Sequence, residues 1–387
     1  MKAIVNGRLV TVTGDTYENG AVLIEDGKII AAGSGIEVPA DCQTIDAKGG
    51  WITPGFIDCH SHISLMEMYS SMPGMQDFNE MSDPVTPQVR AEDAFNPFDA
   101  AIAEVMRAGF TTCYTGPGSA NVIGGTGMSF KLRGHTVEEM MIAGSEQMKF
   151  ALGENPKRVY GTKEKPPITR MGTAALMRDT LTLAREYSDG LRACEKGEKT
   201  EKPKLDPKLQ ALVPVVRGEM RCKIHAHRAD DIATAIRIAG EFGLDYTIEH
   251  ATEGCKILDI LKREKVTCIV GPLLMTPDKR ELWDIRLDTP AKLHEAGIEL
   301  CLTEDAASET IYLPDHIGIM IKHGLPEQAA FEAITINPAR ALKLDGRLGS
   351  IEPGKDADIA VFDGHPFSNM TSCVLTMIDG EVHHNCL

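Results

Sequence analysis

The chain has 387 residues, of which 43% are hydrophobic and 25% charged, and its net charge is −16. This length fits two or three average domains, or one large barrel with an appended domain. An acidic surface disfavours nucleic acids and anionic membranes, so we expect neither as a partner. No stretch approaches the roughly 20 apolar residues of a membrane helix, and the start shows no secretory signal. We therefore expect a cytoplasmic protein.

Ten cysteines are spread along the chain from Cys42 to Cys386 without a CxxC pair. This distribution predicts free thiols rather than disulfides. Cys59 directly precedes His60, but the two-residue period of a strand turns it away from the histidine side.

Both ends of the chain are rich in short strands. Residues 1–55 contain apolar runs such as "AVLIEDGKIIAAG" between Asn-Gly, Asp-Gly and Gly-Gly turns, and the C-terminal end has "DADIAVFDG" and "CVLTMIDGEVHH". Because chain termini usually lie close together, we expect a small β-sandwich domain made of residues 1–55 and 346–387.

The middle of the chain alternates short β-type runs with helical segments, which predicts a parallel sheet. Eight such runs within 56–345 match a (β/α)8 barrel, an α/β fold. The runs are 55–62, 111–116, 127–132, 147–152, 222–227, 245–250, 267–272 and 299–305. The alternative is an open doubly wound sheet, which is disfavoured because no GxGxxG follows the first strand. We expect loops or an excursion over residues 154–221.

Ionisable residues gather at the C-terminal ends of these runs. His60 and His62 share one face of the first strand, and His225 and His227 repeat that spacing on the fifth. His250 ends the sixth run and Asp305 ends the eighth, while Lys149 lies in the fourth. Barrel enzymes carry their active site at this end, and imidazole with carboxylate is a ligand set for zinc and similar ions. Of Glu304 and Asp305 only one can face inward, and we expect Asp305.

These motifs resemble the amidohydrolase superfamily, and within it the imidazolonepropionase-related and prolidase-like branch, over essentially the whole chain. The similar segments are "ITPGFIDCHSH", "KIHAH", "TIEH", "LTED" and the run from 335 to 364. The resemblance implies that His60, His62, His225, His250 and Asp305 bind one or two divalent ions, with zinc expected and manganese or iron as alternatives. It also implies that Lys149 is carboxylated and bridges two ions. The sequence after Lys149 departs from the usual pattern, so Glu154 as the bridging ligand and a mononuclear site stay open.

The implied reaction is hydrolysis of a C–N amide bond in an N-acyl amino acid, a dipeptide or a cyclic amide. Hydroxide activated by the metal attacks, and Asp305 serves as general base. His227, Arg228 and Tyr160 are candidates to contact a small-molecule substrate, and we expect a homo-oligomer. The alternatives are a mononuclear deaminase of a ring amine, a lactonase or phosphotriesterase-like hydrolase, and a non-catalytic scaffold. The scaffold is disfavoured because every expected ligand is present.

Overall fold

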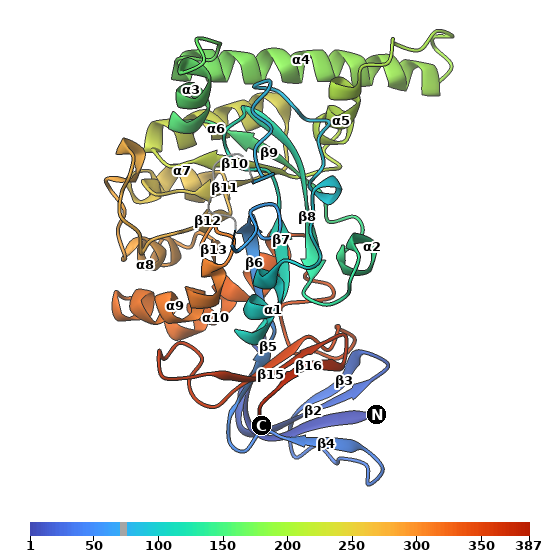
Figure 1. Cartoon of the computed structure of the whole chain (residues 1–387), viewed down its shortest axis with the longest axis vertical. Coiled ribbons are helices and arrows are strands. Elements are labelled where there is room, and N and C mark those ends of the chain that lie inside the picture. The colour runs from blue at the N-terminus through green and yellow to red at the C-terminus, as the bar shows by residue number, and fades with distance from the viewer. Residues whose placement is uncertain (70–75) are drawn as a thin grey trace.

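The computed structural model describes residues 1–69 and 76–387, and it places strands from both chain ends in one sheet. This terminal sheet runs in the order β16-β15-β14-β5-β1-β2-β3, with β4 paired to β1. Its strands are β1 (Lys2–Val10), β2 (Thr16–Glu25), β3 (Lys28–Ser34), β4 (Gln43–Asp46), β5 (Trp51–Pro54), β14 (Ile359–Phe362), β15 (Cys373–Ile378) and β16 (Glu381–Asn385). Figure 1 shows it at the end of the molecule that carries both termini.

One hydrophobic core joins the two halves of the terminal sheet. Ile4 and Val22 from the N-terminal strands share this core with Ile359 and Leu375 from the C-terminal strands. An antiparallel bridge between Lys28 and the chain just before β14 brings the two halves together. In place of the expected two-sheet sandwich, the terminal strands form one sheet that encloses this core.

A single residue, Gly55, connects the last N-terminal strand of the terminal sheet to the first barrel strand. It lies between β5 and β6 (Phe56–Ser61), and a Cβ atom built at this position would lie 2.2 Å from Cγ2 of Thr111. Only glycine leaves room for the Thr111 side chain against the backbone here, which explains the Pro-Gly step before the first barrel strand.

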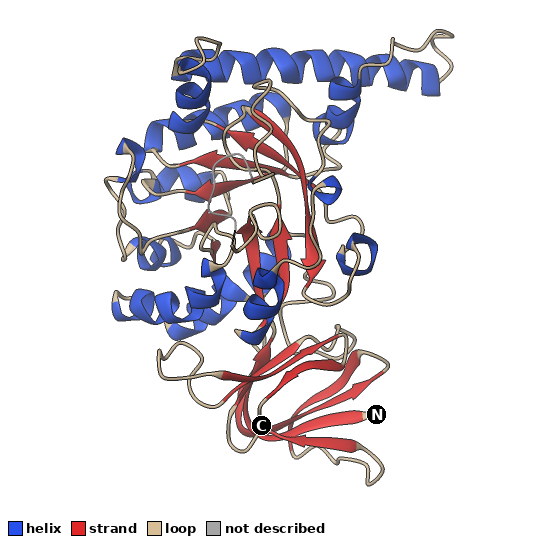
Figure 2. Cartoon of the chain, in the orientation of Figure 1, coloured by secondary structure: helices blue, strands red, loops and turns tan. Residues whose placement is uncertain are grey.

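The barrel strands follow the order β13-β12-β11-β10-β9-β8-β7-β6. The strands after β6 are β7 (Phe110–Thr115), β8 (Ile123–Lys131), β9 (Gln147–Ala151), β10 (Cys222–Ala226), β11 (Tyr246–His250), β12 (Cys268–Val270) and β13 (Leu300–Leu302). The helices are α1 (Ala100–Arg107), α2 (Val137–Met140), α3 (Glu154–Gly161), α4 (Arg170–Glu195), α5 (Pro207–Val216), α6 (Ala229–Phe242), α7 (Leu258–Arg263), α8 (Thr289–Glu295), α9 (Leu313–Lys322), α10 (Glu327–Ile334) and α11 (Ile336–Ala341). The predicted α/β barrel is confirmed, and Figure 2 shows helices around its strands.

The third barrel strand departs from the expected parallel arrangement. β8 pairs antiparallel with both β7 and β9, whereas the other neighbouring strand pairs are parallel. Only residues 116–122 connect β7 to β8. A parallel connection needs a crossover of a dozen or more residues, so this short link forces the chain to turn back.

Side chains and loop backbone bring the first and last barrel strands together. The hydroxyl of Thr303, just after β13, donates to Oδ1 of Asp58 in β6 at 2.8 Å. The backbone N–H of His62 donates to the carbonyl of Ala306 at 3.1 Å. These bonds hold the eighth strand beside the first and so nearly close the barrel.

The region 154–221 is more regular than expected. It forms α3, α4 and α5, and Asp206 caps α5 by accepting from the backbone N–H groups of Lys208 and Leu209. Figure 1 shows α4 lying across the end of the molecule opposite the terminal sheet. The polar, proline-rich composition therefore marks the caps and connections of an excursion that is largely helical.

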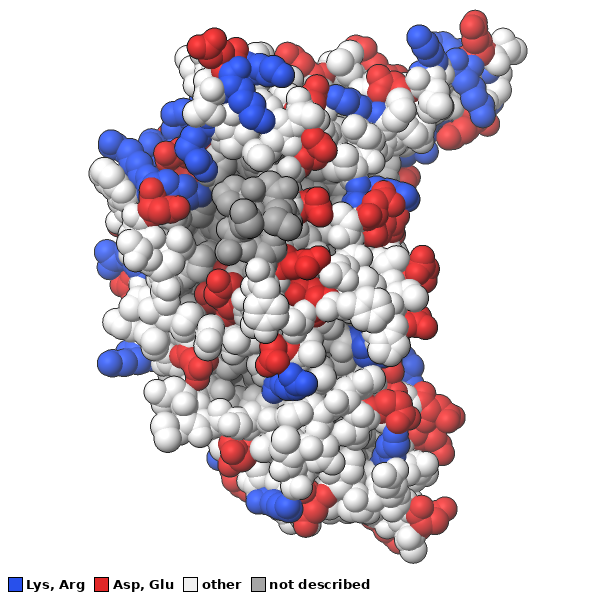
Figure 3. Space-filling view, in the orientation of Figure 1, with Lys and Arg blue, Asp and Glu red and all other residues white. Residues whose placement is uncertain are grey.

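Within residues 1–69 and 76–387, no helix combines the length and apolar character needed to cross a bilayer. Figure 3 shows acidic side chains spread over one face of the molecule, interspersed with Lys and Arg. Cys59 is buried in an apolar cluster with Cys301 and Ile269.

Candidate metal centre

The carboxyl ends of the barrel strands bring together five of the six predicted metal-binding residues. His60 lies in β6, His225 in β10 and His250 ends β11, while His62 directly follows β6 and Asp305 lies three residues after β13. His250 has a φ of +73° and Asp305 a φ of +51°. These left-handed backbone conformations interrupt the strand alternation and re-aim both side chains.

Two imidazoles and one carboxylate form the first group of donors. Nε2 of His60 lies 2.9 Å from Oδ1 of Asp305, and Nε2 of His62 lies 3.2 Å from the same oxygen. The neighbouring Glu304 turns away, and its Oε1 lies 2.8 Å from Nδ1 of His316. The structure therefore presents Asp305 to the centre in preference to Glu304.

The second group consists of His225, His227 and His250, whose ligand atoms lie within 4.8 Å of one another. Nε2 of His250 also lies 3.8 Å from Oδ2 of Asp305, which links this group to the first. The two carboxylate oxygens of Asp305 thus face both groups, an arrangement suited to one ion or to two neighbouring ions.

Buried imidazole nitrogens without partners show that these residues fit a metal ion. Both ring nitrogens of His225 and Nε2 of His250 find no hydrogen-bond partner among the described residues. Nδ1 of His62 lies 2.7 Å from the carbonyl oxygen of Gly116, and Nδ1 of His250 lies 2.7 Å from that of Gly271. A carbonyl requires a protonated Nδ1, which leaves the lone pair of Nε2 free for a cation.

Electrostatics favour neutral imidazoles beside an ionised carboxylate. Burial lowers the pKa of His225 well below its usual value, and the neighbouring His250 adds to this effect. Burial also lowers the pKa of His250 to about 4, although Asp305 opposes the shift. Burial raises the pKa of Asp305, but His250 and His60 outweigh it and hold this pKa well below its usual value. At neutral pH His225, His250 and Asp305 are therefore deprotonated, as metal binding requires.

Lys149 lies in β9 and is buried, with 2% of its surface exposed. It pairs in register with Lys223 of β10, and the Glu249 and Asp305 charges act on its amine. Burial lowers the pKa of Lys149 to about 8. Part of the amine is therefore neutral near pH 8.

The other predicted contact residues differ in position. His227 faces the centre, and its Nδ1 lies 2.8 Å from the Thr252 hydroxyl. Arg228 instead pairs through two nitrogens with Asp230, at 2.9 Å each. The buried Tyr160 donates to Oδ1 of Asn121 at 2.6 Å, so the structure brings neither Arg228 nor Tyr160 to the metal centre.

Four further charged residues border the centre and were missed from the sequence. Nζ of Lys279 lies 2.9 Å from Oε1 of Glu281 and 3.4 Å from Nε2 of His227. Lys223 and Glu249 form a buried ion pair on β10 and β11. Two features of the sequence could have indicated these residues. Lys223 lies two residues before His225 and so shares its face, and the loop after the seventh strand belongs to the catalytic end of a barrel.

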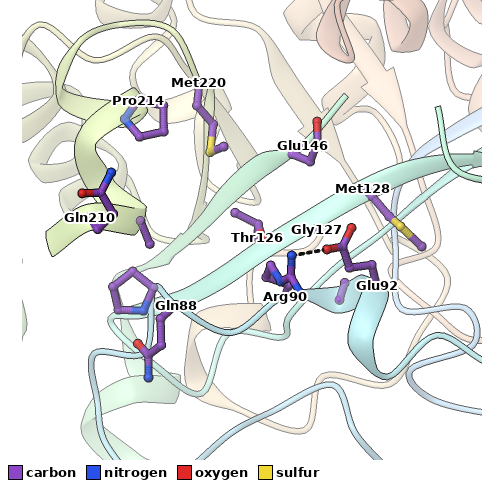
Figure 4. Close-up of a pocket in the computed structure, with 13 residues that line it drawn as sticks. Gln88, Arg90, Glu92, Thr126, Gly127, Met128, Glu146, Gln210, Pro214 and Met220 are labelled. Atoms are coloured by element: carbon purple, nitrogen blue, oxygen red, sulfur yellow. Dashed lines mark ion pairs between the residues drawn. The ribbon is translucent and has the colours of Figure 1, made fainter. Parts of the chain in front are cut away.

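A cavity of about 400 Å³ lies apart from the metal centre, between the 87–92 segment, β8 and α5 (Figure 4). Arg90 and Glu92 form an ion pair in its wall, and none of the residues that line it belongs to the histidine groups. The metal centre is thus distinct from this cavity.

The sequence and structure of this chain match known proteins. The model of the amidohydrolase family matches residues 215–383. A crystal structure of an amidohydrolase from Thermotoga maritima MSB8 is 40% identical, covers all of both chains and has a TM-score of 0.95. The chain belongs to the amidohydrolase family.

Two curated proteins also match this chain, but one is much longer than the chain and the other is less similar in sequence. The amidohydrolase tasK of Hapsidospora irregularis is 30% identical over 93% of this chain, which spans only 39% of the length of tasK. An imidazolonepropionase of Geobacillus sp. (strain WCH70) is 24% identical, with 89% of this chain and 84% of the relative covered. The family therefore indicates a hydrolase that acts on C–N bonds with divalent metal, and it leaves the substrate open.

Proposed function

We propose that this protein is a metal-dependent amidohydrolase that cleaves the C–N bond of an N-acyl amino acid, a dipeptide or a cyclic amide. The observation that carries the proposal is the convergence of unpartnered imidazole nitrogens on both oxygens of Asp305. Such a donor set holds one or two divalent ions, and zinc matches its nitrogen-rich composition best, with manganese or iron as alternatives.

His60, His62, His225, His250 and Asp305 would hold the metal. When bound, a divalent ion lowers the pKa of water and polarises a substrate carbonyl. Asp305 accepts the proton of the attacking water as its oxygen adds to the carbonyl carbon. As the C–N bond breaks, the same carboxyl donates that proton to the departing nitrogen. Atoms and charge balance with water as the only co-substrate.

Lys149 would join the metal ligands as a carbamate. Its neutral amine adds carbon dioxide and releases a proton, and the product is an anion with two oxygens that can bridge two cations. Burial of Lys149 and its lowered pKa support this chemistry. The alternative bridge, Glu154, begins α3, and its backbone N–H donates to Oε2 of Glu281 at 2.9 Å.

Metal analysis of the purified protein followed by a rate screen tests the proposal. The screen compares N-acyl amino acids, dipeptides and hydantoin-like rings with ring amines, lactones and phosphotriesters. We expect bound metal and amide hydrolysis that a chelator abolishes and added zinc restores. Turnover confined to ring amines would identify a deaminase, and turnover confined to esters a lactonase or phosphotriesterase. Each of these outcomes, or a protein that binds no metal, would overturn the amide assignment.

A further inference from the structure

A buried carboxylate lies directly behind the first metal-binding histidine. Glu249 in β11 has no exposed surface, and its Oε2 is in direct contact with Nδ1 of His60. Its other oxygen, Oε1, accepts a hydrogen bond from the hydroxyl of Thr247. Glu249 is therefore held from two sides, and one of those sides is an imidazole of the metal centre.

Lys223 is the counter-charge of this carboxylate. It has no exposed surface, and its Nζ lies 3.3 Å from Oε2 of Glu249. The same ammonium lies 4.7 Å from the ring centre of Tyr114, which places it over an aromatic face. Two opposite charges buried this deeply are costly unless they are paired, so each fixes the position of the other.

The contact distinguishes His60 from the other imidazoles of the centre. His62 and His250 are oriented through Nδ1 by backbone carbonyls, and His227 by a hydroxyl. His60 is oriented by a charged side chain. With Nδ1 turned to Glu249, its Nε2 lies 2.9 Å from Oδ1 of Asp305, on the side where an ion would be held.

We propose that Glu249 is a positioning residue that orients His60 toward the metal, and that Lys223 holds the Glu249 carboxylate in place. This inference rests on the proposed function, because it requires that His60 binds a metal ion. A carboxylate behind a metal-binding histidine fixes its tautomer and ring orientation, and losing such a partner commonly weakens metal affinity 10- to 100-fold.

Zinc affinity of the full chain, measured by competition with a chromogenic chelator, tests this role without any substrate. We expect Glu249→Gln to weaken zinc binding by at least about tenfold. The matched control is Asp358→Asn, because Asp358 is also a buried carboxylate paired with a buried lysine, Lys131 at 3.1 Å, but lies outside the metal centre. The control should keep wild-type zinc affinity even if its Tm falls.

A second pair of variants separates positioning from general damage. The double variant Lys223→Met/Glu249→Leu removes both buried charges together, so it avoids leaving one unpaired. We expect it to fold, as judged by circular dichroism, and to bind zinc at least as weakly as Glu249→Gln. With cobalt as the probe, both variants should show an altered visible absorption spectrum, because His60 no longer holds its orientation.

Combination with His60→Ala decides whether Glu249 acts through His60. If it does, Glu249→Gln should cause no further loss of zinc affinity in the His60→Ala background. Equal losses in both backgrounds, or wild-type zinc affinity in both Glu249 variants, would overturn the inference while leaving the proposed function standing. Failure of the wild-type protein to bind zinc, cobalt, manganese or iron would instead overturn the proposed function.

Discussion

Nε2 of His60 and Oδ1 of Asp305 lie 2.9 Å apart, although one residue belongs to the first barrel strand and the other follows the last. Thr303 connects the same two strands by donating to Oδ1 of Asp58 at 2.8 Å, and its Oγ1 also accepts the N–H of Asp305 at 3.1 Å. Closure of the barrel and assembly of the metal centre therefore depend on the same few residues.

Replacing Asp305 with Asn should abolish most turnover while leaving the four metal-binding histidines in place. The amide cannot accept the proton of water, and loss of a general base commonly costs about 10²- to 10⁴-fold in rate. Measurement of kcat and bound metal on the same sample checks this. Glu304→Gln is the control, because Glu304 pairs with His316 away from the centre. A kcat near the wild-type value in Asp305→Asn would contradict its assignment as base.

Metal removal should lower thermal stability as well as activity. The buried nitrogens of His225 and His250 that lack described partners gain ligand bonds when an ion binds. An ion present at 100 times its Kd stabilises the folded state by about 2.7 kcal/mol. Differential scanning calorimetry before and after chelation should show a lower Tm that zinc restores. His225→Ala should respond less to zinc than the wild type.

Labelled bicarbonate tests the carbamate on Lys149. After exchange with ¹³C-bicarbonate, the wild-type protein should show a carbamate resonance in its ¹³C NMR spectrum, and Lys149→Arg should not. Lys131→Arg is the matched control and should keep the resonance. Lys131 is as buried as Lys149, but it lies among the carboxylates of Asp356, Asp358 and Asp379. A wild-type protein that binds two ions and shows no such resonance would contradict the bridging role.

Lys131 should contribute strongly to the contact between the barrel and the terminal sheet. It extends from β8 to Asp356, Asp358 and Asp379, and its Nζ lies 2.8 Å from Oδ2 of Asp356. Lys131→Met leaves these carboxylates without their buried partner, and breaking such a pair costs about 3–5 kcal/mol. Urea denaturation measures this loss, and a change below about 1 kcal/mol would contradict it.

The same cluster predicts an acid-sensitive component of stability. Burial raises the pKa of Asp356, but Lys131 and Lys28 outweigh it and lower the pKa to about 2. Because this value is below the unfolded pKa of about 3.9, the stabilisation is complete above about pH 5 and is lost progressively as pH falls toward 2. The difference in unfolding free energy between Asp356→Asn and the wild type should therefore be largest near neutral pH. Between pH 4 and pH 2 the unfolding free energy of the variant should fall less steeply than that of the wild type.

Much of the fold and of the donor set was predictable from the sequence. Period-two alternation places His60 and His62 on one face, and likewise His225 and His227. The rule that active sites lie at the carboxyl end of barrel strands brings these pairs toward His250 and Asp305. The short link before β8 also contained the information that this strand turns back, although the expectation of a parallel sheet concealed it.

The tertiary structure decided which charges face the metal centre and which face elsewhere. Glu249 and His250 are adjacent, and simple alternation would separate them, but the positive φ of His250 brings both to the interior. Arg228 follows His227 directly, yet it pairs with Asp230 because that carboxylate lies within reach. Local sequence determines the period of a strand. The direction of a side chain at the strand end depends on backbone angles and partners that only the folded chain supplies.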